Sequence, residues 1–234
     1  MTLLKVEGIH TFIQQYHILQ GVSLEAKEGR VTVLLGRNGA GKTTTLRSIM
    51  GFHKVSRGTI YFKNERVDSL APHEIARKGI SYVPEDQGIF NGLTVGENLY
   101  IAMRKNDEKE SERLDYVLAL FPDLKTFWHK KGGHLSGGQK QMLALARAYI
   151  QDSQLMLIDE PSKGLAPIMV EKVSESIMEM KKKRTIILVE QNFVMASAIG
   201  DDFYIIDNGR TVYSGKMEQL REDKEMCRQY LGIT

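Results

Sequence analysis

Apolar residues occur along this chain in two kinds of run, and each kind predicts a different element. Short continuous apolar runs predict strands buried on both faces at positions 30–35, 155–158 and 185–189. Apolar residues at helical spacing predict helices at 94–103, 111–121, 168–183 and from Ser136 onward. Because strands and helices alternate after position 155, the core is expected to be an α/β fold with a parallel sheet.

Further strands are predicted near both ends of the chain. Runs at 3–7, 21–26 and 58–62 indicate a small antiparallel layer. Runs at 203–206 and 211–213 flank Asp207-Asn208-Gly209, whose Asn-Gly pair tolerates the positive φ values of a tight hairpin turn. The charged run 104–110 between two middle helices is expected to be a solvated linker. We therefore expect a single domain over 1–234, in which 1–88 and 150–234 form the core and about 89–149 form a helical lobe.

The helix that starts near Ser136 opens unusually, with two glycines in its first turn. Ser136 and Gln139 have the spacing of a capping box, which fixes the helix start. Gly137 and Gly138 are each less favourable in a helix than alanine, by up to about 1 kcal/mol. A first turn without side chains exposes backbone N–H groups and the positive end of the helix dipole, so it suits a phosphate.

A second glycine-rich segment follows the first buried strand. It reads Gly36-Arg37-Asn38-Gly39-Ala40-Gly41-Lys42-Thr43, a glycine, four residues, and then Gly-Lys-Thr. The glycines allow the loop to turn its N–H groups inward around an anion. Lys42 can then reach the outer phosphates of a nucleotide, and the Thr43 hydroxyl can bind Mg²⁺.

Two adjacent carboxylates end the strand at 155–158. In an open α/β sheet, ligands collect beyond the carboxyl ends of the strands, where the glycine-rich loop also lies. Asp159 is therefore expected to hold Mg²⁺, and Glu160 to orient or polarise an attacking water.

Together these motifs resemble the nucleotide-binding subunits of ATP-binding-cassette transporters. In that family the segment Leu135-Ser136-Gly137-Gly138-Gln139 is the signature, 36–43 the phosphate loop and 155–160 the acidic strand. The resemblance implies a P-loop NTPase core with a RecA-like, mostly parallel sheet, an N-terminal antiparallel β layer and an inserted α-helical lobe. It also implies that two subunits pack head to tail, with each ATP between one phosphate loop and the other subunit's signature helix.

The resemblance assigns a role to each matching position. Catalysis falls to Glu160, Gln191 and Lys42, and Mg²⁺ binding to Thr43, Asp159 and Glu85. The family's usual glutamine before the helical lobe aligns with Glu85, although Gln87 lies close by and is the alternative. Where the family has a switch histidine, this chain has Gln191, so hydrolysis should lack a histidine titration there. Nucleotide contacts fall to Gly36, Arg37, Asn38, Gly39, Ala40, Gly41, Lys42, Thr43, Thr44, Ser136, Gly137, Gly138 and Gln139.

The residue that stacks on adenine is left open by the sequence. The family's spacing points to Ile13, which is not aromatic, but Phe12 and Tyr16 lie on either side of it. Each ring is equally consistent with stacking on the base and with ordinary packing.

Within the family, four segments resemble the ATPases of branched-chain amino acid, urea and short-amide importers: 83–85, 159–167, 189–192 and 230–232. This implies transmembrane permease subunits, an extracytoplasmic solute-binding protein and a second ATPase subunit, identical or similar, as partners. The alternatives are a lipid or polysaccharide exporter ATPase, a soluble ATPase of this family acting on nucleic acid or ribosomes, and a nucleotide-binding regulator without turnover.

Composition agrees with this assignment. The 234 residues, 42% hydrophobic and 26% charged, are typical of one globular domain. A formal charge of +3 is too small to indicate nucleic-acid binding. No apolar run approaches the roughly 20 residues that span a bilayer, and the start of the chain leads into a strand. The single cysteine, Cys227, fits a reducing compartment. We therefore expect a cytoplasmic protein on the inner face of the cell membrane.

Overall fold

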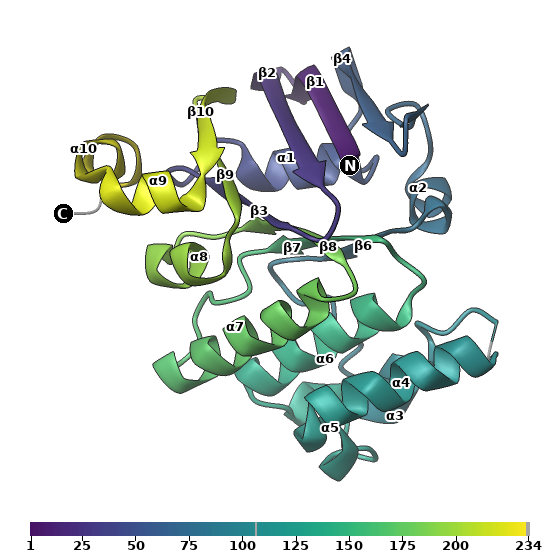
Figure 1. Cartoon of the computed structure of the whole chain (residues 1–234). Coiled ribbons are helices and arrows are strands. Elements are labelled where there is room, and N and C mark those ends of the chain that lie inside the picture. The colour runs from purple at the N-terminus through teal and green to yellow at the C-terminus, as the bar shows by residue number, and fades with distance from the viewer. Residues whose placement is uncertain (106, 233–234) are drawn as a thin grey trace.

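A six-stranded sheet crosses the middle of the molecule and contains the buried strands that the hydrophobic pattern predicts (Figure 1). The computed structural model describes residues 1–105 and 107–232. The strand order is β10-β9-β3-β8-β7-β6, and all neighbours run parallel except β10 and β9. The strands are β3 (Val31–Leu35), β6 (Ile80–Val83), β7 (Leu155–Asp159), β8 (Thr185–Val189), β9 (Asp202–Asp207) and β10 (Arg210–Lys216). The predicted mostly parallel core is confirmed.

A second, antiparallel sheet confirms the predicted β layer. Its order is β2-β1-β4-β5, formed by β1 (Thr2–Ile13), β2 (Tyr16–Lys27), β4 (Val55–Phe62) and β5 (Glu65–Arg66). The first two strands are at least twice as long as expected, with 12 residues each. Their pairing shifts register between Val6 and Ile9, and such irregularities interrupt the alternation on which a sequence prediction relies.

The helices are distributed on both sides of the central sheet (Figure 1). They are α1 (Lys42–Ile49), α2 (Pro72–Lys78), α3 (Val95–Tyr100), α4 (Glu108–Leu120), α5 (Pro122–Thr126), α6 (Gly137–Ile150), α7 (Pro167–Lys181), α8 (Phe193–Ile199), α9 (Met217–Glu222) and α10 (Lys224–Met226), with short turns at Gly132–His134 and Cys227–Leu231. Among the described residues, no helix has both the length and the apolarity to cross a membrane.

Two hydrophobic cores lie on opposite faces of the central sheet because successive side chains of a strand point to opposite sides. In β8, Ile186 and Leu188 join the cluster that contains α6 and α7. Ile187 and Val189 join the cluster that contains α1 and the antiparallel sheet. A strand buried on both faces therefore reads as a continuous apolar run, which is the pattern at 185–189.

The charged run 104–110, whose last three residues begin α4, is only partly solvated, so the prediction of a solvated linker is wrong at Glu110. This residue is 3% exposed, and its carboxylate accepts hydrogen bonds from the backbone N–H groups of Arg104 and Lys105 at 2.8 and 2.9 Å. Asp107 caps the helix by accepting from the Glu110 N–H, so α4 starts three residues earlier than expected. Position 106 of this run lies outside the described residues.

The β9–β10 hairpin has the predicted turn, and its tip contacts the glycine-rich loop. Asn208 and Gly209 have φ values of 45° and 73°. The Gly209 N–H donates to the Ala40 carbonyl at 2.9 Å, and the Gly209 carbonyl accepts from the Gln20 N–H at 2.7 Å. The turn thus joins β2 to the loop that precedes α1.

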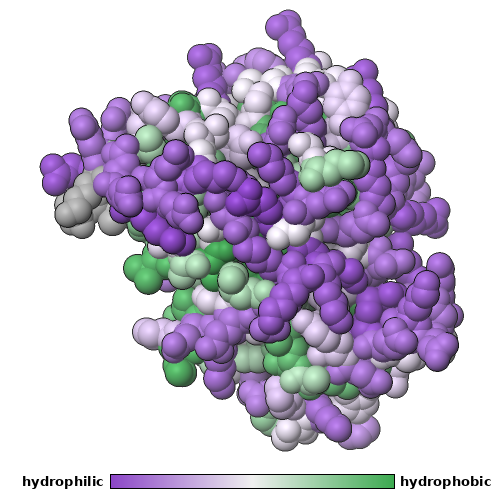
Figure 2. All heavy atoms as spheres, in the orientation of Figure 1, coloured by the Kyte–Doolittle hydropathy of each residue, from purple (hydrophilic) through white to green (hydrophobic). Residues whose placement is uncertain are grey.

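The surface seen in Figure 2 is mostly hydrophilic, but hydrophobic side chains gather on one flank, at the left of the view, where α8 and the first turn of α7 lie. Val194 of α8 is 79% exposed and Ile168 of α7 is 61% exposed. We call this flank the α7–α8 flank.

Replacement of Leu188 by alanine should lower the free energy of unfolding by about 2–5 kcal/mol, because this fully buried side chain fills the core between β8 and the helices. The measurement is urea unfolding followed by circular dichroism. Val194→Ala on the exposed face of α8 is the matched control and should change stability by less than about 0.5 kcal/mol. Equal effects of the two substitutions would contradict the central position of β8.

Candidate functional site

The loop between β3 and α1 has a backbone that requires glycine. Gly36 has φ of 142°, and a Cβ there would lie 2.1 Å from the Ile206 carbonyl oxygen. Gly41 has φ of 109°, and a Cβ would lie 2.8 Å from a methyl group of Leu19. Gly39 has open space but a φ of 79°, which side chains with a Cβ rarely adopt. The loop is therefore held in one shape by the strand and hairpin around it.

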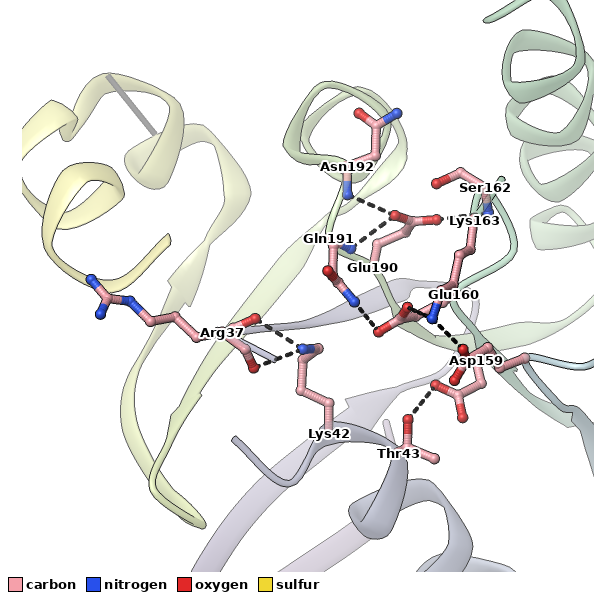
Figure 3. Close-up of polar contacts among 12 residues, drawn as sticks. Arg37, Lys42, Thr43, Asp159, Glu160, Ser162, Lys163, Glu190, Gln191 and Asn192 are labelled. Carbon is pink, nitrogen blue, oxygen red and sulfur yellow. Dashed lines mark hydrogen bonds and ion pairs between the residues drawn. The ribbon is translucent and has the colours of Figure 1, made fainter. Parts of the chain in front are cut away.

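Lys42 and Thr43, at the start of α1, face different partners (Figure 3). The Lys42 ammonium donates to the carbonyls of Gly36 and Arg37 at 2.9 and 3.1 Å. It is 4% exposed, and burial lowers its pKa although the nearby carboxylates of Glu160 and Asp159 act in the opposite direction. Thr43 Oγ1 donates to Asp159 Oδ1 at 3.0 Å. Ala40 is buried, Thr44 is half-buried and Asn38 is exposed at the tip of the loop.

Asp159 ends β7 and is fully buried. Its second oxygen accepts a hydrogen bond from the Tyr82 hydroxyl of β6 at 3.1 Å. Burial raises the pKa of Asp159, and the bonds from Thr43 and Tyr82 offset part of that effect by stabilising the carboxylate. Sequence reasoning did not identify Tyr82, whose hydroxyl holds this carboxylate from the neighbouring strand.

Glu160 turns sharply out of the strand, with φ of 46°. Its N–H donates to the Val189 carbonyl of β8 at 2.9 Å, and its carboxylate accepts a hydrogen bond from the Gln191 side-chain amide. Figure 3 shows Gln191 reaching Glu160 from the loop after β8. The structure thus brings together Glu160 and Gln191, two residues that the sequence places 31 positions apart.

Glu190 is a further buried carboxylate to which the sequence assigned no role. It is 1% exposed and accepts three backbone N–H groups: Ser162 at 2.9 Å, Gln191 at 2.9 Å and Asn192 at 2.8 Å. Bonds from N–H to a carboxylate are among the stronger ones in proteins. Glu190 therefore joins the loop after Glu160 to the loop that contains Gln191. The signal in the sequence was a carboxylate directly after a fully apolar strand.

Glu85 lies on the loop after β6 and forms an ion pair with Lys163 of the loop after β7. Lys163 Nζ also lies 3.9 Å from Glu160 Oε2. Gln87 is half-buried with a φ of 64°, and its N–H donates to the Pro84 carbonyl at 2.9 Å. Of these two residues, Glu85 is the one joined by Lys163 to the carboxylates at the end of β7.

The predicted capping box at the start of α6 is confirmed. Ser136 Oγ accepts from the Gln139 N–H at 3.3 Å, and the Gln139 side chain accepts from the Ser136 N–H at 3.0 Å. The two glycines differ, however. A Cβ on Gly138 would lie 2.4 Å from Cε and 3.1 Å from Cγ of Met169, whereas a Cβ on Gly137 would meet only Leu165, at 3.7 Å. Packing against Met169 therefore accounts for a glycine at position 138. The packing around Gly137 leaves room for a Cβ, so it does not account for a glycine there.

The aromatic rings near the β1–β2 turn differ in their contacts. Phe12 is 49% exposed and stacks on His17, with ring centroids 4.2 Å apart and planes 7° apart. Tyr16 is 61% exposed. His17 in turn shares a hydrogen bond of 3.0 Å with His10. One face of Phe12 is therefore covered by a ring that sequence reasoning did not include.

Arg37 points away from Lys42 (Figure 3). Its guanidinium is exposed and donates to the Gln229 carbonyl at 3.2 Å, so it joins the loop to the last turn of the described chain. Its side chain is thereby directed toward a backbone carbonyl and not toward the interior of the glycine-rich loop.

The oxygen atoms near Thr43 suit Mg²⁺. A hydroxyl and a carboxylate are hard oxygen ligands, and Mg²⁺ usually takes only one or two protein ligands beside waters and substrate phosphates. Across the described residues, no three acidic, histidine or cysteine side chains converge as a metal cluster. The Thr43–Asp159 pair therefore fits a metal that arrives with a nucleotide better than a metal held by the protein alone.

Known proteins match the chain over its whole length. A model of the family described as "ABC transporter" matches residues 19–163. A probable branched-chain amino acid transport ATP-binding protein, LivF, from Archaeoglobus fulgidus is 36% identical over 234 residues, covering 99% of each chain. The branched-chain amino acid transport ATP-binding protein BraG of Pseudomonas aeruginosa is 37% identical over 232 residues, covering 98% of this chain and all of the other.

A lipopolysaccharide export ATP-binding protein, LptB, from Haemophilus influenzae is 30% identical over 237 residues, covering 99% of this chain and 98% of its own. A crystal structure of a nucleotide-free ATP-binding cassette from an ABC transporter superposes with a TM-score of 0.85 at 26% identity, covering all of both chains. The motifs, the fold and these matches agree, and the chain belongs to the ATP-binding-cassette (ABC) transporter family.

Proposed function

We propose that this chain is the ATP-hydrolysing subunit of an ABC importer and that it powers the uptake of branched-chain amino acids or of a related small polar solute such as urea or a short amide. The observation that supports the proposal is that two groups face each other at one edge of the sheet. They are the Lys42–Thr43 end of the phosphate loop and the Glu160–Gln191 pair. Such an arrangement places a phosphate-binding loop beside a carboxylate able to orient water.

In this proposal, different groups of the chain bind the phosphates and the metal of Mg-ATP. The N–H groups of the loop from Gly36 to Thr44 and the Lys42 ammonium hold the phosphates. Thr43 and Asp159 would hold Mg²⁺, with Glu85 as a further ligand. The metal, when bound, neutralises charge that develops on the phosphate oxygens.

Glu160 orients a water for in-line attack and accepts its proton. The Gln191 amide fixes the carboxylate by donating to it. Gln191 carries no charge at ordinary pH, so it acts through hydrogen bonds alone.

A second subunit completes the site in this proposal. The hydrogen bonds of residues 136–139, within the described chain, run among themselves and toward α6, and none joins them to the phosphate loop. The open surface over Gly137 and the exposed Ser136 are therefore available to the phosphate of another subunit. The exposed α7–α8 flank supports the same idea, because exposed hydrophobic patches commonly mark association surfaces.

Permease subunits, and through them an extracytoplasmic solute-binding protein, are the proposed partners, with the chain on the cytoplasmic face of the membrane. The names of the LivF and BraG relatives support this choice. Glu85 and the helical lobe are the proposed surface for the permease, and no nucleic-acid partner is proposed.

An exporter ATPase is the second candidate, favoured by the 30% identity to LptB. Copurification separates the two functions: membrane subunits with a solute-binding protein support import, whereas lipid-handling partners support export. Ribosomal or DNA partners would remove both transport proposals. For an importer, the ligand of the copurified binding protein identifies the solute.

Glu160→Gln should lower the rate of ATP hydrolysis by roughly 10²- to 10⁴-fold, because the amide keeps the shape of the side chain but cannot accept the proton. Binding of a fluorescent ATP analogue should persist. Phosphate release by the reconstituted ATPase assembly is the measurement. Glu179→Gln, an exposed carboxylate on α7, is the control and should keep the full rate. An unaltered rate in Glu160→Gln would show that the assigned base is wrong.

Gly137→Ala and Gly138→Ala should separate function from folding. Gly138→Ala should be less stable than Gly137→Ala by about 1 kcal/mol, since its Cβ forces the Met169 side chain to move. Gly137→Ala should fold at least as stably as the wild type, because its Cβ has room and alanine is the better helix former. It should nevertheless lower hydrolysis at least tenfold by covering the amides that meet the partner's phosphate. Thermal unfolding and hydrolysis rates test both changes. The proposal for Gly137 fails if that variant hydrolyses ATP normally.

A further inference from the structure

Lys163 bridges two loops at the edge of the site. Its ammonium pairs with Glu85, on the loop after β6, and lies 3.9 Å from Glu160 Oε2, at the end of β7. The Lys163 N–H also donates to the Glu160 carbonyl at 3.2 Å, which places the lysine one turn beyond that residue. One side chain therefore contacts the candidate catalytic carboxylate and a candidate metal ligand.

The charges at this edge do not balance. Four carboxylates, those of Glu85, Asp159, Glu160 and Glu190, act electrostatically on the Lys42 ammonium. Lys163 interacts with three of them, and it is the second ammonium group of the cluster. The Arg47 guanidinium also interacts electrostatically with Asp159. These three cations face four carboxylates, so an excess of negative charge remains that a bound cation would neutralise.

The two lysines differ in their ability to move. Lys42 is 4% exposed and donates to two carbonyls of its own loop. Lys163 has a side chain that is 59% exposed, and its partner Glu85 is 38% exposed. A long lysine side chain at such a place can swing into water at little cost in solvation, because exposed ion pairs contribute little net stability.

We propose that Lys163 is the counter-cation of this site before Mg²⁺ binds, and that it must leave Glu85 before Mg²⁺ can bind with the nucleotide. This inference rests on the proposed function, since it assumes that Mg-nucleotide binds between Thr43 and Asp159. Lys163 is a positioning residue in this role. Its ammonium holds Glu85 and Glu160 in place while no metal neutralises them, and it competes with the metal for Glu85. The Mg²⁺ concentration at which half of the protein binds the nucleotide with the metal is then higher than it would be without the lysine.

The test measures metal-dependent nucleotide binding and needs no turnover. Full-length protein is mixed with a fluorescent ADP derivative, and Mg²⁺ is titrated while fluorescence is recorded. Lys163→Gln should lower the Mg²⁺ concentration at half-saturation by roughly three- to tenfold, the size expected when the metal no longer competes with an exposed ion pair for Glu85. Lys182→Gln is the matched control, because it removes a somewhat more exposed lysine–glutamate pair at the end of α7. It should leave the midpoint unchanged.

A second variant tests whether the effect runs through Glu85. In a Glu85→Gln background the lysine has lost its strongest partner, so adding Lys163→Gln should shift the midpoint by less than about twofold. Thermal unfolding of each variant should match that of the wild type, because the pair is exposed.

The outcomes are distinguishable. If wild-type protein binds the ADP derivative in a Mg²⁺-dependent way but Lys163→Gln leaves the midpoint unchanged or raises it, the role of Lys163 is overturned and the proposed function stands. An undiminished shift in the Glu85→Gln background overturns the competition at Glu85. If wild-type protein shows no Mg²⁺-dependent nucleotide binding, the proposed function fails, and the role of Lys163 fails with it.

Discussion

The parallel alignment of β3, β8 and β7 is the constraint on which the site depends. In parallel neighbours the carboxyl ends lie at one edge, so the loops that follow them meet there. The pairing of Asp159 with Val189 sets which residues of these loops face each other. That register brings Thr43 to Asp159 and Gln191 to Glu160. The two hydrophobic cores hold the register from both faces of the sheet.

Local chemistry is the part of this arrangement that the sequence predicts well. A phosphate loop needs glycine where φ is positive, and a capping box needs serine and glutamine three residues apart. Both can therefore be recognised from a short sequence motif. The buried strands can be predicted because both of their faces are apolar. The hairpin at Asn208-Gly209 can be predicted because its turn requires positive φ at two positions.

Contacts between segments that lie far apart in the chain are the features of the site that could not be predicted from the sequence. Tyr82, Lys163 and Glu190 each contact a strand or loop other than their own, and their roles depend on strand order and register. Glu110 misleads because a carboxylate in a charged run is normally solvated, whereas here backbone N–H groups enclose it. Gly138 has a packing role that its sequence neighbours do not indicate, because a Cβ there would meet Met169, which lies 31 positions later. In both cases the contacts are made with groups that the local sequence pattern does not identify.

The hydrogen bonds that Glu190 accepts restrict the movement of two loops of the site. Its single carboxylate accepts N–H groups from the loop after Glu160 and from the loop that contains Gln191, so neither loop can shift without stretching bonds to the other. Both loops also touch Glu160, one through the chain itself and one through the Gln191 amide. A displacement of Ser162 would therefore strain the hydrogen bonds that position Gln191 and, through its amide, Glu160.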